Sequence, residues 1–114
     1  AWLRNYELFD APHVAVLSRD KRLGEYATLD VGVWLGMFMM AAQSLGLDTC
    51  AMASVAAYPK TLRALLGIPD DELILCGIAF GHRDPSVPAN SARTVRQAVS
   101  ANLRTATLPE NSVE

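Results

Sequence analysis

The sequence has few cysteines and no cysteine motif. Cys50 and Cys76 both lie inside apolar stretches, and neither has the C-x-x-C or Cys/His spacing of a zinc site or a redox dithiol. Because free cysteine is among the most buried residue types, we expect both to be reduced core residues. The pattern therefore predicts no metal site, and two reduced thiols favour a cytoplasmic location.

An excess of positive charge is also absent. Ten basic and 12 acidic residues leave a formal net charge of −2, which gives no broad field for nucleic acid or an anionic membrane surface. The longest uncharged run, residues 31–47, is barely at the lower limit for a membrane span. Arg4, Glu7 and Asp10 interrupt the N-terminal segment, so no secretion signal is expected there. We expect neither a nucleic acid nor a membrane as partner.

The motifs of common catalytic sites are missing too. The sequence contains no G-x-S-x-G elbow, no phosphate-binding G-x-x-x-x-G-K-[ST], no G-x-G-x-x-G and no H-E-x-x-H. His13 begins an apolar run and His82 follows another, and no nucleophile or carboxylate partner is evident for either. Both are expected to be hydrogen-bonded structural residues. No catalytic side chain is predicted, so an enzyme of this sequence would depend on a cofactor.

Apolar residues make up 51% of the chain, enough to bury the core of one domain. Apolar runs predict strands at 13–17, 49–53 and 73–80, and the last is continuous enough to be a central strand covered on both faces. A short amphipathic helix is predicted to begin at Pro59 and to stop at Gly67. Strands that alternate with helices indicate an α/β or α+β layered domain.

Between these elements the sequence predicts segments without regular structure. Residues 19–22 are charged and suit a solvated turn, and residues 54–58 suit a loop of mostly small side chains. Residues 81–96 have no apolar periodicity and are expected to form a long loop, a class that often carries function.

A longer helix is predicted between Thr28, which can cap its start, and Gly46, which suits a left-handed end. A helix that is apolar on all sides must be buried on all sides, which predicts a partner surface. Gly32 and Gly36 lie one turn apart and would admit another backbone, although helices without such a contact show the same spacing. Both interpretations remain open. The large apolar side chains surrounding the axis are Trp34, Leu35, Met37, Phe38, Met39 and Met40.

Short strings along nearly the whole chain carry a family resemblance. They are RNY at 4–6, FDAPH at 9–13, GLDTCAMASV at 46–55, YP at 58–59, LGIP at 66–69, CGIAFG at 76–81, PAN at 88–90 and RTVR at 93–96. Together and in this order they resemble the nitroreductase family, most of all its nitrobenzoate-reductase-like branch.

The resemblance implies an α+β sandwich with a central, mainly antiparallel sheet and flanking helices, usually as an intertwined homodimer with FMN at the subunit interface. NADH or NADPH would reduce the flavin, which in turn reduces a nitroaromatic, a quinone or a similar flat aromatic acceptor. Residues 1–99 would form the C-terminal half of such a domain and residues 100–114 a loosely structured tail. Family members are much longer and carry an N-terminal flavin-binding segment that nothing here matches.

The resemblance also implies site residues. Arg96 matches the arginine that binds the FMN phosphate, with Arg93 as the alternative if the loop register differs. A planar guanidinium fits phosphate oxygens, and small residues let backbone N–H groups approach a flavin edge. Without the resemblance, the alanines suit ordinary packing and the arginine an ordinary surface position. The segment implied to run beside the isoalloxazine ring is Ala51, Met52, Ala53 and Ser54.

Three hypotheses follow from the sequence. The first is a flavin oxidoreductase segment whose site is completed by another chain or by self-association. The second is a shortened protein that binds a flavin or flat aromatic without turnover. The third is a truncated chain with a purely structural, oligomeric role.

Overall fold

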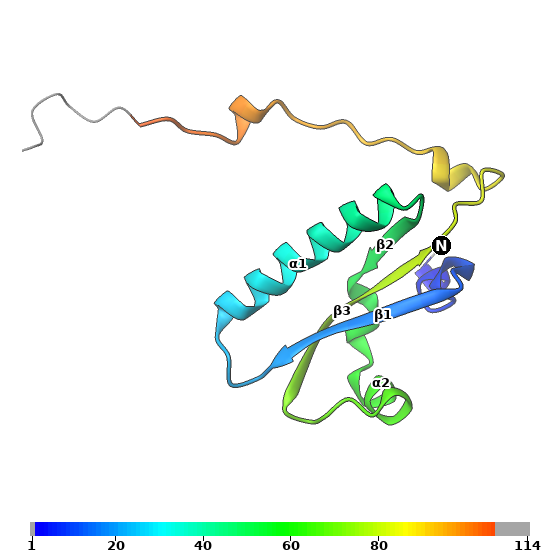
Figure 1. The fold of residues 1–114 in the computed structure, drawn as a ribbon, viewed down its shortest axis with the longest axis vertical. Coiled ribbons are helices and arrows are strands. Elements are labelled where there is room, and N and C mark those ends of the chain that lie inside the picture. Colours follow the sequence, from blue (N-terminus) through cyan, green and yellow to red (C-terminus); the bar gives the residue numbers. More distant parts are fainter. Residues whose placement is uncertain (1, 107–114) are drawn as a thin grey trace, which may run out of the picture. The chain divides into compact units, whose positions relative to one another are not determined.

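The computed structural model describes residues 2–106, and the chain divides into two compact units between Asp84 and Pro85. The first unit holds all the α-helices and strands of the described chain (Figure 1). Helices and a sheet in one layered unit confirm the predicted α+β class. These elements are β1 (His13–Asp20), α1 (Glu25–Ser44), β2 (Asp48–Met52), α2 (Pro59–Leu66) and β3 (Glu72–Gly81).

The sheet has three antiparallel strands in the order β1-β3-β2. β3 is central, and β2 is an edge strand that pairs with no second strand of the described chain. Val16 of β1 and Met52 of β2 lie opposite Gly77 on its two sides. Ile78 is 0% exposed and Ala79 2%, so β3 is covered on both faces, as its continuous apolar run predicts.

Helix α1 packs along one face of the sheet (Figure 1). The ring of Phe38 meets Phe80 of β3 edge to face, with centroids 5.7 Å apart. The residues of α1 that are shielded from solvent are mostly three or four positions apart and form one stripe along the helix. They are Ala27, Val31, Leu35, Phe38, Met39 and Ala42.

Outside this stripe α1 is exposed and still carries large apolar side chains. Met37 is 66% exposed and Met40 77%. Large apolar side chains therefore surround the helix axis, as predicted, while the described residues cover only one stripe of it. No helix within residues 2–106 is long and apolar enough to cross a membrane.

The other face of the sheet carries the main apolar cluster. The chain leaves β2 as a 3₁₀ helix, η3 (Ala53–Ala57), which turns back over β3. Met52, Val55 and Ala79 form the buried centre of this cluster. The half-buried residues packed around it are Leu8, Ala11, Val16 and Leu62.

The start of α1 differs from the prediction. The helix begins at Glu25, with Gly24 at its N-cap. Thr28 is therefore not the cap, and its hydroxyl accepts a hydrogen bond of 2.8 Å from Nε of Arg19. Arg19 itself lies in β1, which runs on to Asp20, so the predicted turn at 19–22 begins two residues late. The left-handed Gly46 after the helix agrees with the prediction.

Two further expectations are wrong. Cys50 is exposed on β2, which is the edge strand of the sheet. Cys76 on β3 is half-buried, and its burial raises the pKa of the thiol.

The segment predicted as a loop at 54–58 is mostly the 3₁₀ helix η3. A run of small residues lets the backbone coil tightly against the sheet.

An unusual turn precedes β1. Leu8, Phe9 and Asp10 all have positive φ angles, 54°, 55° and 62°. Left-handed backbone costs about 1–2 kcal/mol for each residue with a Cβ. The turn is held by Arg4, whose guanidinium contacts the carboxylates of Glu7 and Asp10. Packing of Leu8 against the apolar cluster of Met52, Val55 and Ala79 offsets part of the strain.

The second unit contains two short 3₁₀ helices, η4 (Pro88–Ser91) and η5 (Val99–Ala101). The remainder of residues 85–106 has neither helix nor strand, which fits the expected long loop. Most of the tail predicted at 100–114 lies outside the described residues, and a domain boundary after residue 99 stays a prediction.

Gly67 tests how α2 ends. It has φ +66°, its N–H donates to the carbonyl of Arg63, and a Cβ there would meet nothing within 4 Å. Gly67→Ala should therefore lower the free energy of unfolding by about 1 kcal/mol through backbone strain alone. Gly36→Ala is the matched control, since its Cβ also meets open space but its backbone is helical.

The control should raise the free energy of unfolding, by up to about 1 kcal/mol. Urea denaturation measures both variants. An unchanged midpoint for Gly67→Ala would contradict the strain argument. A loss at Gly36 would show that another backbone contacts the helix there.

Candidate functional site

The segment predicted to face a flavin lies where β2 passes into η3. Ala51 ends the exposed part of the strand, and Met52 points into the apolar cluster with 2% exposure. Ala53 is exposed, Ser54 is half-buried, and Val55 is buried again at 8%. Two buried side chains therefore bracket a pair of small residues. Because the Met52 side chain is in the core, only its backbone remains available to a ligand.

Ser54 carries the one buried polar side-chain atom that lacks a hydrogen-bond partner in the described chain. Its Oγ is shielded from solvent, although the residue as a whole is half-buried. Leaving a buried hydroxyl unsatisfied costs about 1–3 kcal/mol. The hydrogen-bonding capacity of this hydroxyl is therefore unused among the described residues.

The predicted phosphate ligands lie in the second unit. Nη1 of Arg93 donates to the carbonyls of Asn90 and Ala92, at 3.1 and 2.9 Å. Nη1 of Arg96 donates to Oγ1 of Thr94. Within residues 2–106 neither guanidinium has a carboxylate partner, and both residues are exposed. Both guanidinium groups keep donors for an anion.

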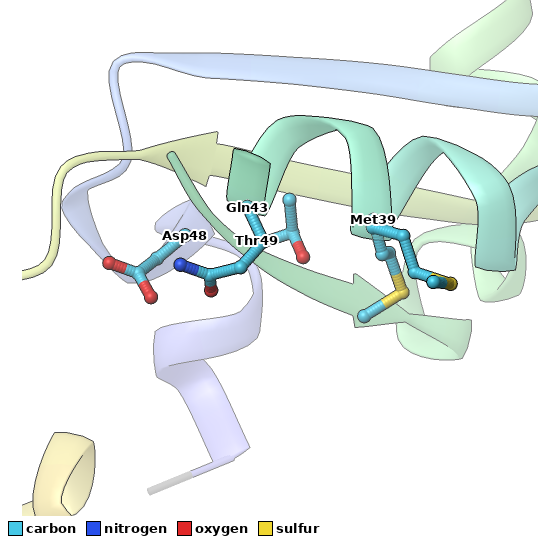
Figure 2. A pocket seen from close by; sticks show the side chains of 5 residues that line it. Met39, Gln43, Asp48 and Thr49 are labelled. Atoms are coloured by element: carbon cyan, nitrogen blue, oxygen red, sulfur yellow. The ribbon is translucent and has the colours of Figure 1, made fainter. Parts of the chain in front are cut away.

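A groove runs between the C-terminal turns of α1 and the start of β2. Its volume is about 460 Å³. Figure 2 shows Met39 at one end and Asp48 at the other, with Gln43 and Thr49 between them. The groove thus changes from apolar to polar along its length.

The carboxylate at the polar end of the groove already has an ion-pair partner. The Asp48 carboxylate contacts the Arg83 guanidinium, and this hydrogen bond holds the pKa of Asp48 below its usual value. The pair joins the start of β2 to the chain just after β3, because Asp48 lies opposite Gly81 in the sheet. Its role is to fasten the edge strand, and it offers no free carboxylate for acid/base chemistry.

Neither histidine lies in an arrangement for catalysis. His13 stacks on the ring of Phe80, with centroids 5.4 Å apart, at the paired ends of β1 and β3. His82 is exposed just after β3. Among the described residues no three His, Cys, Asp or Glu side chains cluster to hold a metal ion.

Sequence reasoning missed two parts of this site. It treated Val55 as part of a loop, whereas Val55 anchors η3 to the core. It did not single out the Ser54 hydroxyl, whose isolation only a structure reveals. Gly77 could have indicated the packing of Val55 from the sequence. An isolated glycine inside a strand pattern indicates a close approach by another part of the chain.

Comparison with known proteins agrees with this architecture. A model of the nitroreductase family matches residues 1–82. A 4-nitrobenzoate reductase of Pseudomonas putida is 33% identical over 93 residues, which are 82% of this chain and 41% of that protein. A 4-nitrobenzoate reductase of Nocardioides sp. (strain LMS-CY) is 35% identical over 102 residues, which are 88% and 40%. The chain spans about two fifths of the length of these curated relatives.

Solved structures show the same likeness. The FMN- and NADPH-dependent nitroreductase NfnB from sphigopyxis sp. strain HMH matches with a TM-score of 0.87 and 30% identity, over 92% of this chain and 47% of that one. The FMN-dependent NfnB from Mycobacterium smegmatis, solved in complex with NADPH, matches with a TM-score of 0.86 and 29% identity, over 91% and 46%. With the family model covering most of its length and the same fold around β3, this chain belongs to the nitroreductase family.

Proposed function

We propose that this chain forms the flavin-facing part of an FMN-dependent, NAD(P)H-oxidising nitroreductase acting on nitroaromatic compounds, quinones or similar flat acceptors. One observation carries the proposal: the buried hydroxyl of Ser54, which lies between Met52 and Val55 and has no hydrogen-bond partner among residues 2–106. The matching structures of FMN- and NADPH-dependent nitroreductases support the choice of cofactor and reductant.

The residues of this segment fit a flavin edge. Ala51 and Ala53 are exposed and carry no side chain beyond Cβ, so a flat ring could approach their backbone. Ser54 adds a hydroxyl that can donate or accept a hydrogen bond. FMN supplies the hydride chemistry when it is bound, and the protein supplies position and hydrogen bonds. This division of roles matches a chain for which no catalytic side chain is proposed.

We propose Arg96, with Arg93 as the alternative, as the ligand of the FMN phosphate. Each is exposed and lacks a carboxylate partner within the described residues. A charge-assisted, bidentate contact with a phosphate is the strong form of hydrogen bonding for such a group.

The proposed assembly is a homodimer in the cytoplasm. The exposed side of α1 is apolar over several turns, and a contiguous apolar surface of this kind marks an interaction site. The thiols of Cys50 and Cys76 are both free, which fits a reducing compartment.

The oligomeric state can be tested on α1. Burial stabilises at about 25 cal/mol per Å² of apolar surface, so a charge placed on this side should be strongly unfavourable in an interface. Light scattering should give at least twice the chain mass of 12.3 kDa for the unmodified protein. Met37→Lys should reduce that mass toward one chain.

Leu65→Lys is the matched control, because Leu65 is 74% exposed on α2 and Met37 66% on α1. It should leave the mass unchanged. A mass near 12.3 kDa for the unmodified chain at micromolar concentration would contradict the proposed self-association.

The Ser54 hydroxyl makes the flavin proposal testable in two opposite directions. Without FMN, Ser54→Ala removes an unsatisfied polar atom, so the free energy of unfolding should stay constant or rise by about 1 kcal/mol. With FMN, the same change should weaken binding, measured by quenching of flavin fluorescence. Ser18→Ala is the control, since the Ser18 hydroxyl donates to Glu72 and its loss should destabilise the chain.

A Ser54→Ala variant that loses stability as Ser18→Ala does, and binds FMN as the unmodified chain does, would contradict the proposal. Tight FMN binding without oxidation of NADPH would support a binding role without turnover instead.

Arg96→Ala tests the phosphate contact. Loss of hydrogen bonds to a charged group costs on the order of 1.5–3 kcal/mol, so the FMN dissociation constant should rise roughly tenfold or more. Arg104→Ala is the control, because that residue has no proposed role and is also exposed. Equal dissociation constants for the two variants would exclude Arg96 as the ligand and direct the test to Arg93.

A further inference from the structure

We infer that Gly77 is a positioning residue for the flavin-facing segment: the space left by its missing side chain seats Val55 and thereby sets where Ala53 and Ser54 lie. The inference rests on the proposed function for its consequence in FMN binding. The packing that it describes stands on the structure of the chain alone.

The contact between Gly77 and Val55 is unusually close. A Cβ at Gly77 would lie 2.9 Å from Cγ2 of Val55 and 3.2 Å from both its Cβ and Cγ1. Gly77 lacks a positive φ, so its backbone does not itself demand glycine. Glycine in the interior of a strand weakens the strand and often marks a close approach. The close approach of Val55 therefore explains the glycine.

The location of Gly77 decides whether β3 or η3 would move if residue 77 were larger. Its strand is paired on both sides, with Val16 and Met52 opposite it. The next two residues, Ile78 and Ala79, are 0% and 2% exposed. A strand so enclosed has little freedom to shift. The η3 segment, which crosses it as one short 3₁₀ helix, has to move instead.

Movement of η3 would carry the candidate site with it. Ala53 and Ser54 directly precede Val55, and Met52 before them is fixed in the core. A shift of Val55 must therefore be absorbed by Ala53 and Ser54. These are the residues whose backbone and hydroxyl are proposed to meet the flavin.

Gly81 provides a matched control on the same strand. A Cβ at Gly81 would lie 2.7 Å from Cδ and 3.1 Å from Cγ of Pro12. Gly81→Ala is thus the same substitution with a similar clash, but the atoms it meets belong to Pro12 before β1 and not to η3. Both variants should lower the melting temperature.

The experiment compares Gly77→Ala and Gly81→Ala in the full 114-residue chain. Without FMN, amide chemical shifts of residues 53–57 should change in Gly77→Ala and stay close to those of the unmodified chain in Gly81→Ala. With FMN, the dissociation constant should rise roughly tenfold or more only in Gly77→Ala. The absorption spectrum of the bound flavin should shift in that variant alone.

Rescue provides a second measurement. Adding Val55→Ala to Gly77→Ala removes Cγ1 and Cγ2, which make two of the three close contacts. The double variant should recover part of the FMN affinity. If Gly77→Ala does not fold, Val55→Ala alone loosens the same contact from the other side and should also weaken FMN binding.

The outcomes separate this inference from the proposed function. Failure of the unmodified chain to bind FMN would overturn the proposed function, while the amide shifts of residues 53–57 would still decide the positioning role. Unchanged shifts in Gly77→Ala, or equal FMN affinities in Gly77→Ala and Gly81→Ala, would overturn the inference. When Gly77→Ala does not fold, an unchanged FMN affinity in Val55→Ala would do the same.

Discussion

Packing against both faces of β3 is the constraint on which the rest of the first unit depends. Its middle residues, Ile78 and Ala79, are almost fully enclosed. One face requires α1, which meets it through Phe38, and the other requires η3, which meets it through Val55. Hydrogen bonds to β1 and β2 fix the strand laterally. The end of β2 is therefore held in place by the core. The exposed residues next to Met52, Ala51 and Ala53, are fixed by the same packing.

Much of this arrangement could be predicted from the sequence, because strong local signals agree with the packing. The apolar run ending at Phe80 predicts a doubly covered strand, and Pro59 with Gly67 marks both ends of α2. The start of α1 could not be predicted from Thr28, because the threonine hydroxyl bonds to a strand residue instead of capping the helix. Cys50 was misplaced because composition does not reveal which strand forms the edge.

The candidate site could be predicted only in part, and for a physical reason. The small residues at 51, 53 and 54 fit a flavin edge as well as they fit simple packing, so the role proposed for them came from family resemblance. Two features of this segment depend on tertiary contacts. The Ser54 hydroxyl has no hydrogen-bond partner in the described chain, and Val55 packs closely on Gly77. Such features arise between segments distant in sequence, where a local pattern such as the glycine at 77 indicates a close approach but not the residue that approaches.

The edge position of β2 has a consequence for handling the protein. Beyond Asp48 the strand is uncharged, and no other described strand pairs with its outer side. Natural proteins guard such edges with charges, prolines or cover, because an open row of backbone donors and acceptors recruits strands from other molecules. The residues leading into the candidate site thus also form a template for aggregation, and concentrated stocks of the isolated chain would lose material through intermolecular sheet growth.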